Sequence, residues 1–66
     1  MIIVNLKKIL DDKNITLYSL QQDTNITYPA LYKLAKNQTK SISFDVLEKI
    51  CISLDCDIND LLTIER

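Results

Sequence analysis

The chain has 66 residues, of which 47% are hydrophobic and 26% charged, and a formal net charge of −1. This composition is typical of a globular protein and excludes a disordered chain, and the length suits one domain without an interdomain active-site cleft. No apolar run approaches the roughly 20 residues of a membrane span, and the N-terminal residues lack the pattern of a signal peptide. We therefore expect a single cytoplasmic domain that spans residues 1–66.

Apolar residues recur with a period near 3.6, which predicts five short helices and no alternating segment long enough for a strand. The first helix is expected to end near Asn14, the second to follow Thr16, and the third to carry Pro29 in its first turn, where the missing N–H costs nothing. In chain order, the apolar stripes are Ile3, Leu6, Ile9 and Leu10; Leu17 and Leu20 with Gln21; Leu31, Leu34 and Ala35; Val46, Leu47, Ile50, Cys51 and Leu54; and Ile58, Leu61 and Leu62.

Residues with a side-chain oxygen precede four of the five predicted helices. Thr16, Thr27, Ser43 and Asp57 are predicted N-caps, because each can accept a hydrogen bond from an N–H of the first turn. Asp60 follows Asp57 by three residues and makes an approximate capping box, with Asp where Glu is usual.

The chain contains no glycine, although helices commonly end on a residue with positive φ and glycine adopts that conformation most easily. Asn and Asp tolerate the left-handed region better than most other residues. We infer that Asn14, Asn25, Asn37 and Asp55 replace C-cap glycines at four helix ends. For any one of them, the alternative is an ordinary polar loop residue.

Charge is unevenly distributed along the chain. No Asp or Glu occurs between Thr24 and Phe44, whereas Lys33, Lys36 and Lys40 all lie there. Because the local field decides which surface meets a phosphate backbone, this segment can bind nucleic acid despite the net charge. The alternative is an ordinary solvated surface.

The sequence shows no arrangement of residues that is typical of catalysis or metal binding, with no Cys–His or Ser–His pairing and no clustered carboxylates. Cys51 and Cys56 are five residues apart, which fits neither a CxxC pair nor a four-ligand zinc set, and there is no histidine. We expect two reduced core thiols, no metal, no cofactor and no enzyme activity. Because the helices account for nearly the whole chain, we also expect no small-molecule effector.

The segment 17–34, LYSLQQDTNITYPALYKL, has the pattern of a helix-turn-helix. Gln21 stands where the two helices cross, Asn25 is the predicted turn residue with positive φ, and Ile26 and Leu31 lock the helices at a steep angle. The second helix can then enter a major groove about 12 Å wide.

The whole chain, over residues 3–62, resembles the Xre family, the Cro/repressor-type helix-turn-helix domains of bacteria and their phages. NLKKIL followed by NIT resembles the first helix and the entry to the motif, and SFDVLEKICISLDCDINDLL resembles the fourth and fifth helices. Gln21 and Asn25 depart from the Ala and Gly usual in the family, and Cys51 and Cys56 match core positions. The resemblance implies an all-α, five-helix Cro/repressor-type domain.

By position, the resemblance also implies DNA contacts from the third helix and the loop after it. Thr27 can donate to a phosphate, Tyr28 can stack on a sugar or touch a thymine methyl, and Lys33 can donate to guanine O6 or N7. Alternatively, Tyr28 is a surface aromatic, Lys33 is merely solvated, and Pro29 only stiffens the first turn. The full predicted set is Gln21, Thr27, Tyr28, Pro29, Tyr32, Lys33, Lys36, Gln38, Thr39, Lys40 and Ser41.

These features favour a sequence-specific transcriptional regulator, a repressor or Cro-like protein of a bacterium or its phage or mobile element. Its expected partner is a double-stranded DNA operator, bound as a homodimer. Leu61, Leu62 and Ile64, joined by Phe44, are expected to form the dimer contact, unless Leu61 and Leu62 instead close the core of the monomer. The alternative function is a helix-turn-helix interaction module without DNA binding, such as an antirepressor or antitoxin-like partner.

Overall fold

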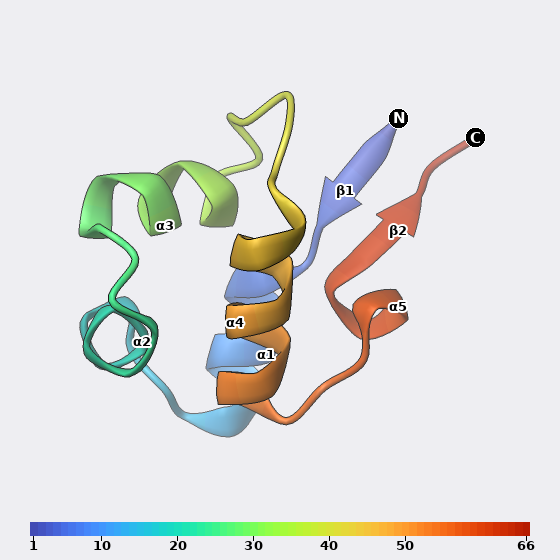
Figure 1. Cartoon of the computed structure of the whole chain (residues 1–66). Helices are drawn as coiled ribbons and strands as arrows, with labels where there is room; N and C mark the ends of the chain where they lie inside the picture. The colour runs from blue at the N-terminus through green and yellow to red at the C-terminus, as the bar shows by residue number, and fades with distance from the viewer.

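The computed structural model describes residues 1–66 as five helices and one small antiparallel sheet (Figure 1). The five predicted helices are confirmed. No helix has both the length and the apolar character of a membrane span. In chain order, the elements are β1 (Ile2–Val4), α1 (Leu6–Lys13), α2 (Leu17–Thr24), α3 (Tyr28–Ala35), α4 (Phe44–Leu54), α5 (Ile58–Leu61) and β2 (Leu62–Ile64).

The sheet is the main departure from the expectation of helices alone. β1 and β2 pair the two ends of the chain, with Ile3 opposite Thr63 and Val4 opposite Leu62. Ile3 therefore does not belong to the first helix, and Leu62 does not belong to the last one. Three residues are too few to show the alternation by which a strand is recognised, and their pairing depends on tertiary contacts between distant segments.

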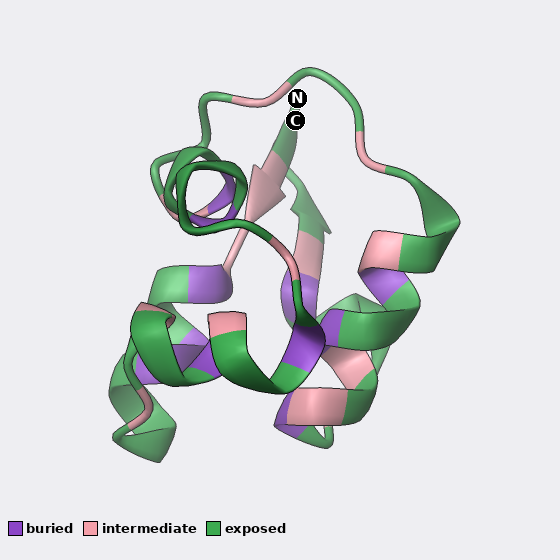
Figure 2. Cartoon of the chain, turned by 60° about the vertical axis from the view of Figure 1, so that its left-hand side comes forward, coloured by how far each residue is buried: buried purple, intermediate pink, exposed green.

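All five helices contribute to one hydrophobic core, and Figure 2 shows their buried faces turned inward. Each predicted apolar stripe supplies part of this core. Leu61 is 0% exposed, so it closes the core of the monomer and cannot form the dimer contact that was one of its two predicted roles. The buried apolar residues are Leu6, Ile9, Leu10, Leu20, Leu31, Leu34, Leu47, Ile50, Leu54 and Leu61.

The inference about helix ends is confirmed at all four positions. Asn14, Asn25, Asn37 and Asp55 have φ values of 59°, 63°, 57° and 51°, and they are the chain's positive-φ residues. After α1, α3 and α4, the next N–H closes a six-residue Schellman loop. These bonds run from Ile15 N to Leu10 O (2.9 Å), from Gln38 N to Lys33 O (2.9 Å), and from Cys56 N to Cys51 O (3.0 Å).

Two of the four predicted N-caps, Thr16 and Ser43, accept a side-chain hydrogen bond as expected, and the predicted capping box of α5 is present. The hydroxyls of Thr16 and Ser43 accept from the backbone N–H three residues on, at 3.1 and 3.2 Å. In the capping box of α5, the Asp60 carboxylate accepts from the Asp57 N–H at 3.0 Å. Thr27 has the extended backbone of an N-cap, but its hydroxyl makes no capping hydrogen bond, so its predicted side-chain cap is wrong. That hydroxyl is left free for another partner.

Candidate nucleic-acid interface

α2 and α3 are joined by the short turn Asn25–Thr27 and lie across each other (Figure 1). Leu20 of α2 and Leu31 of α3 are fully buried, and Ile26 between them is half-buried against the core. The apolar lock predicted for a helix-turn-helix is therefore present. Gln21 is half-buried, and its side-chain amide is not among any buried groups without a partner, so it fits the crossing with the amide open to solvent.

The turn itself is held by a residue that sequence reasoning missed. Thr24 is 6% exposed and is the one buried polar residue of the chain. Its hydroxyl donates to Leu20 O at 2.7 Å and accepts from Ile26 N–H at 3.3 Å, while Asn25 N–H donates to Gln21 O at 2.8 Å. The available signal was a Thr in the last turn of a helix, where a hydroxyl can bond back to the carbonyl four residues earlier.

One flank of α3 faces α1 and the start of α2 across a surface hollow. Tyr28 and Tyr32 line it from successive turns of α3, and Lys36 lines it from the C-cap position. The Lys36 ammonium lies 5.6 Å from the centre of the Tyr32 ring, a cation–π distance. Lys7 and Asp11 of α1 both line the same hollow, 3.8 Å apart in an exposed ion pair, so this side of α3 carries one carboxylate. Lys7 is a further cation beside α3 that the sequence did not single out.

The other flank of α3 faces the loop that leads to α4. Pro29 and Lys33 line this second hollow from α3, and Thr39 and Ser41 line it from the loop. α3 is therefore a ridge between two hollows, and most of the predicted DNA-contacting residues line one hollow or the other. Neither Asp nor Glu lines the loop-side hollow.

The remaining predicted residues lie at the edges of this surface. Thr27 is exposed at the start of α3, and Gln38 and Lys40 are exposed in the loop after it. Gln21 is the one member of the predicted set that is half-buried within the motif rather than on the ridge or the loop side. A phosphate backbone would thus find hydroxyls and ammonium groups on both sides of α3.

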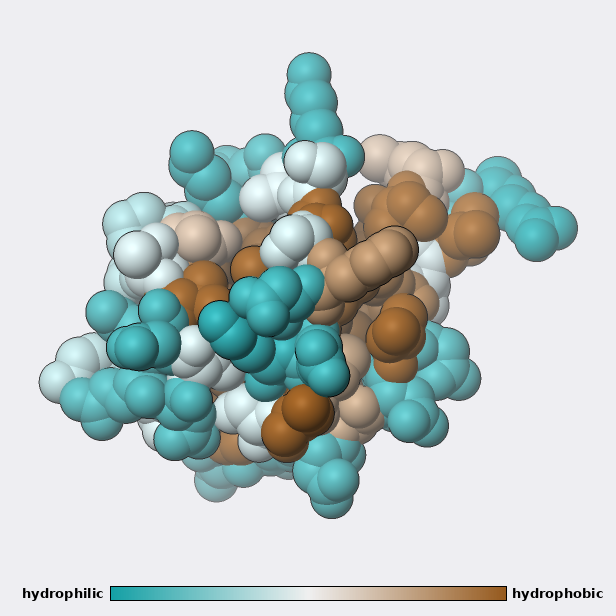
Figure 3. Space-filling model, viewed as in Figure 1, coloured by the Kyte–Doolittle hydropathy of each residue, from teal (hydrophilic) through white to brown (hydrophobic).

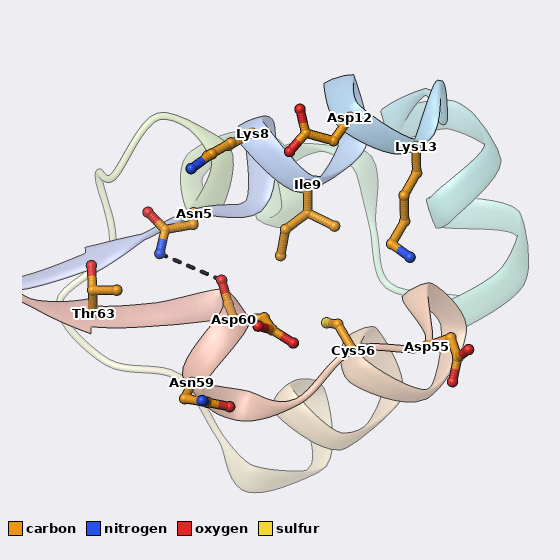
Figure 4. A pocket seen from close by; sticks show the side chains of 10 residues that line it. All are labelled: Asn5, Lys8, Ile9, Asp12, Lys13, Asp55, Cys56, Asn59, Asp60 and Thr63. Carbon is orange, nitrogen blue, oxygen red and sulfur yellow. Dashed lines mark hydrogen bonds between the residues drawn. The ribbon is translucent and has the colours of Figure 1, made fainter.

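A third hollow lies between α1 and the segment around α5 (Figure 4). Its lining carries the carboxylates of Asp12, Asp55 and Asp60, and the Asn5 amide donates to Asp60 O at 3.5 Å. Lys8 and Lys13 line the same hollow, so the mixed charges leave no cationic excess there, and this hollow is a poorer candidate for nucleic acid than the loop-side hollow, which has no carboxylate. No group of three or more His, Cys, Asp or Glu residues is placed to hold a metal ion.

The two cysteines are free and pack against the core, half-buried, at the corner between α4 and α5. Burial raises the pKa of the Cys56 thiol to about 11, and the neighbouring Cys51 adds to the shift. A thiol with a raised pKa is a poor nucleophile at neutral pH, which agrees with a structural role.

A small helical core that presents α3, the second helix of the α2–α3 motif, at its surface is the architecture of helix-turn-helix DNA-binding domains. The family model of the Cro/C1-type HTH DNA-binding domain matches residues 5–66, so the chain belongs to this family of DNA-binding regulators, which are not enzymes. No curated protein matches the chain. β1 precedes the matched residues.

Proposed function

We propose that the chain is a sequence-specific transcriptional regulator, of the repressor or Cro-like kind, that places α3 in the major groove of its operator. The observation that carries this proposal is the α3 ridge, with Tyr28 and Tyr32 on one flank and Lys33 on the other. An α-helix fits the major groove, and a ridge between two hollows leaves room for the phosphate backbones on either side.

Within this arrangement, α3 and the loop have different tasks. Tyr28 and Lys33 are exposed on the part of α3 that would meet base edges. Thr27, Lys36 and Lys40 lie at the two ends of the helix or beyond it, where the DNA backbone would pass. Contacts to bases specify the sequence, whereas contacts to phosphates set the register of the protein.

The experiment is a pair of salt titrations on a selected operator and on scrambled DNA. Lys33→Ala should weaken the free energy of binding to the operator by about 1–3 kcal/mol and reduce the sequence preference at one base pair. Lys40→Ala should weaken binding to both DNAs alike and reduce the log–log salt slope by about one unit. Reversed effects of the two variants would contradict the proposed docking, and a parent without any salt-dependent binding would favour the interaction module.

We further propose that the regulator binds its operator as a homodimer. Helix-turn-helix dimers bind half-sites about 34 Å apart, so the contact between the two protomers lies away from the recognition helix. Phe44 is 87% exposed and Ile64 is 63% exposed, and apolar atoms gather in Figure 3 over the side that carries α4, α5 and the strands. These two residues therefore remain candidates for the contact, although Leu61 does not. Sedimentation with and without operator DNA tests the stoichiometry.

A further inference from the structure

β1 is the element to which neither the family match nor the helix-turn-helix assigns a role. Val4 lies opposite Leu62 in the ladder, while the hydrogen bonds between the chain ends fall on residues one step away, such as Asn5 N to Leu61 O at 2.7 Å. In an antiparallel pair the bonded positions alternate, so the N–H and C=O of Val4 point to the outer edge of β1. Such an edge ordinarily has free backbone groups.

The side chain of Asn37 occupies this outer edge. Val4 N–H donates to Asn37 Oδ1 at 2.6 Å, and Asn37 Nδ2 donates to Val4 O at 3.1 Å. The amide thus satisfies both backbone groups of Val4, as a neighbouring strand would. We refer to Asn37 and Val4, joined by these two hydrogen bonds, as the β1–Asn37 clamp.

The backbone of Asn37 is at the same time the left-handed end of α3. Its N–H donates to Leu34 O at 3.1 Å, and Gln38 N–H donates to Lys33 O at 2.9 Å. The backbone of Asn37 is therefore held by the recognition helix and its side chain by β1. The residues that come directly after it are the loop residues 38–41, which face the DNA in the proposed function.

Apart from the bond of the Gln38 N–H to Lys33 O, no backbone hydrogen bond holds this loop. Within residues 38–41, Thr39 is half-buried and the others are exposed. No side chain of these residues makes a hydrogen bond within the chain, whereas Asn37 makes two to a strand anchored in the sheet. In Figure 1 the loop and β1 rise on the same side of the molecule. The direction in which the chain leaves α3 therefore depends on the clamp.

We propose that the β1–Asn37 clamp sets the position of loop 38–41 and thereby its contacts with the DNA backbone. Asn37 is a positioning residue in this proposal, because it acts through the loop and does not itself touch DNA. β1, although it lies before the residues matched by the family model, becomes part of the DNA-binding apparatus. This inference rests on the proposed function.

The test uses Asn37→Gly, which keeps the positive φ and the Schellman hydrogen bonds but removes the amide. Asn14→Gly is the matched control, because Asn14 has nearly the same φ and the same type of helix end but no side-chain hydrogen bond. Two measurements are made on each variant: hydrogen exchange of the Val4 amide in the free protein, and the salt dependence of operator binding.

We expect Asn37→Gly to speed exchange at Val4 by about tenfold or more, since its N–H loses a partner. The log–log salt slope should fall by about one unit for each phosphate contact that the loop loses. Asn14→Gly should leave both quantities at their parental values. Val4→Pro, which removes the same N–H from the strand side, should reduce the slope as Asn37→Gly does, and the double variant should add nothing further.

The outcomes separate this inference from the function on which it rests. If the parent binds DNA and Asn37→Gly retains the parental slope and affinity, the clamp's role is overturned while the proposed function stands. If the parent itself shows no salt-dependent binding, the proposed function fails, and the clamp's role in DNA binding fails with it. Equal loss of slope in Asn14→Gly would also overturn the inference, because the effect would then come from glycine at a helix end.

Discussion

The α3 region, residues 27–41, and the α4–α5 region, residues 44–61, present opposite chemistry to solvent. The first carries tyrosines, lysines and hydroxyls and has no carboxylate. The second carries exposed Phe44, Ile52 and Ile58 beside a groove edged by Glu48 and Asp57. A chain with a net charge of −1 can therefore offer one surface to a polyanion and keep its carboxylates elsewhere.

The comparison indicates that the binding properties of the surface and the stability of the fold can be changed separately in this chain. Exposed residues of the α3 region should affect DNA binding with little effect on stability, and those of the α4–α5 region should affect association. Buried groups beneath either region should affect stability first. Four substitutions, ordered by the size of the expected effect, test this separation.

Thr24→Val should give the largest effect. The substitution keeps the volume but removes the hydroxyl that bonds Leu20 O and Ile26 N–H beneath the turn. Leaving a half-buried N–H without its partner should cost about 1–3 kcal/mol in the free energy of unfolding, measured by urea denaturation. Thr27→Val is the matched exposed control. Because its hydroxyl makes no capping bond, it should change stability by no more than about 0.5 kcal/mol while weakening DNA binding.

Asn25→Val should have the next largest effect. It should lower the free energy of unfolding by about 1–2 kcal/mol, because a β-branched residue is strained at a φ of 63°. Asn25→Gly should be neutral or stabilising in the same thermal or urea melts, since glycine adopts this conformation freely. Asp55, with a φ of 51° at the end of α4, allows the same pair of substitutions in the other region. A Val variant at Asn25 as stable as the parent would contradict the role of the turn.

Phe44→Ser should change the stability of the monomer by no more than about 0.5 kcal/mol, since the side chain is 87% exposed. If Phe44 forms part of the dimer contact, the variant should sediment with one protomer where the parent has two. Tyr28→Ser, in the α3 region, should leave the stoichiometry unchanged and weaken binding to the operator. Loss of dimers in both variants would mean that the two regions do not divide these tasks.

At neutral pH the smallest effect should come from Cys56, whose contribution to stability changes only under alkaline conditions. Its pKa is raised from 9.0 to about 11 in the folded chain, so above pH 9 the unfolded chain loses this proton while the folded chain keeps it. Stability contributed by the neutral thiol is thus present below pH 9 and is lost as the pH rises toward 11. The difference in unfolding free energy between the parent and Cys56→Ser should fall over this range and be flat below pH 8. A flat difference throughout would contradict the raised pKa.

The sequence by itself determined the helices, because their signals are local. Apolar residues at a period of 3.6 marked the buried faces, and hydroxyls or carboxylates marked most of the N-caps. The absence of glycine drew attention to Asn14, Asn25, Asn37 and Asp55, and all four have positive φ. Those predictions depended on neighbours within about six residues, which is the range of capping interactions.

Only the tertiary structure determined the features that depend on contacts between distant segments, which are the strands, the burial of Leu61 and the side-chain hydrogen bonds of Asn37. The strands exist because residues 2–4 meet residues 62–64, and Leu61 is buried because the core closes over it. The second role of Asn37 follows from the same sheet, since its amide partner is 33 residues earlier in the chain. No local pattern reports these pairings, because the free energy that selects them comes from burying surfaces and pairing backbone groups that only the folded chain brings together.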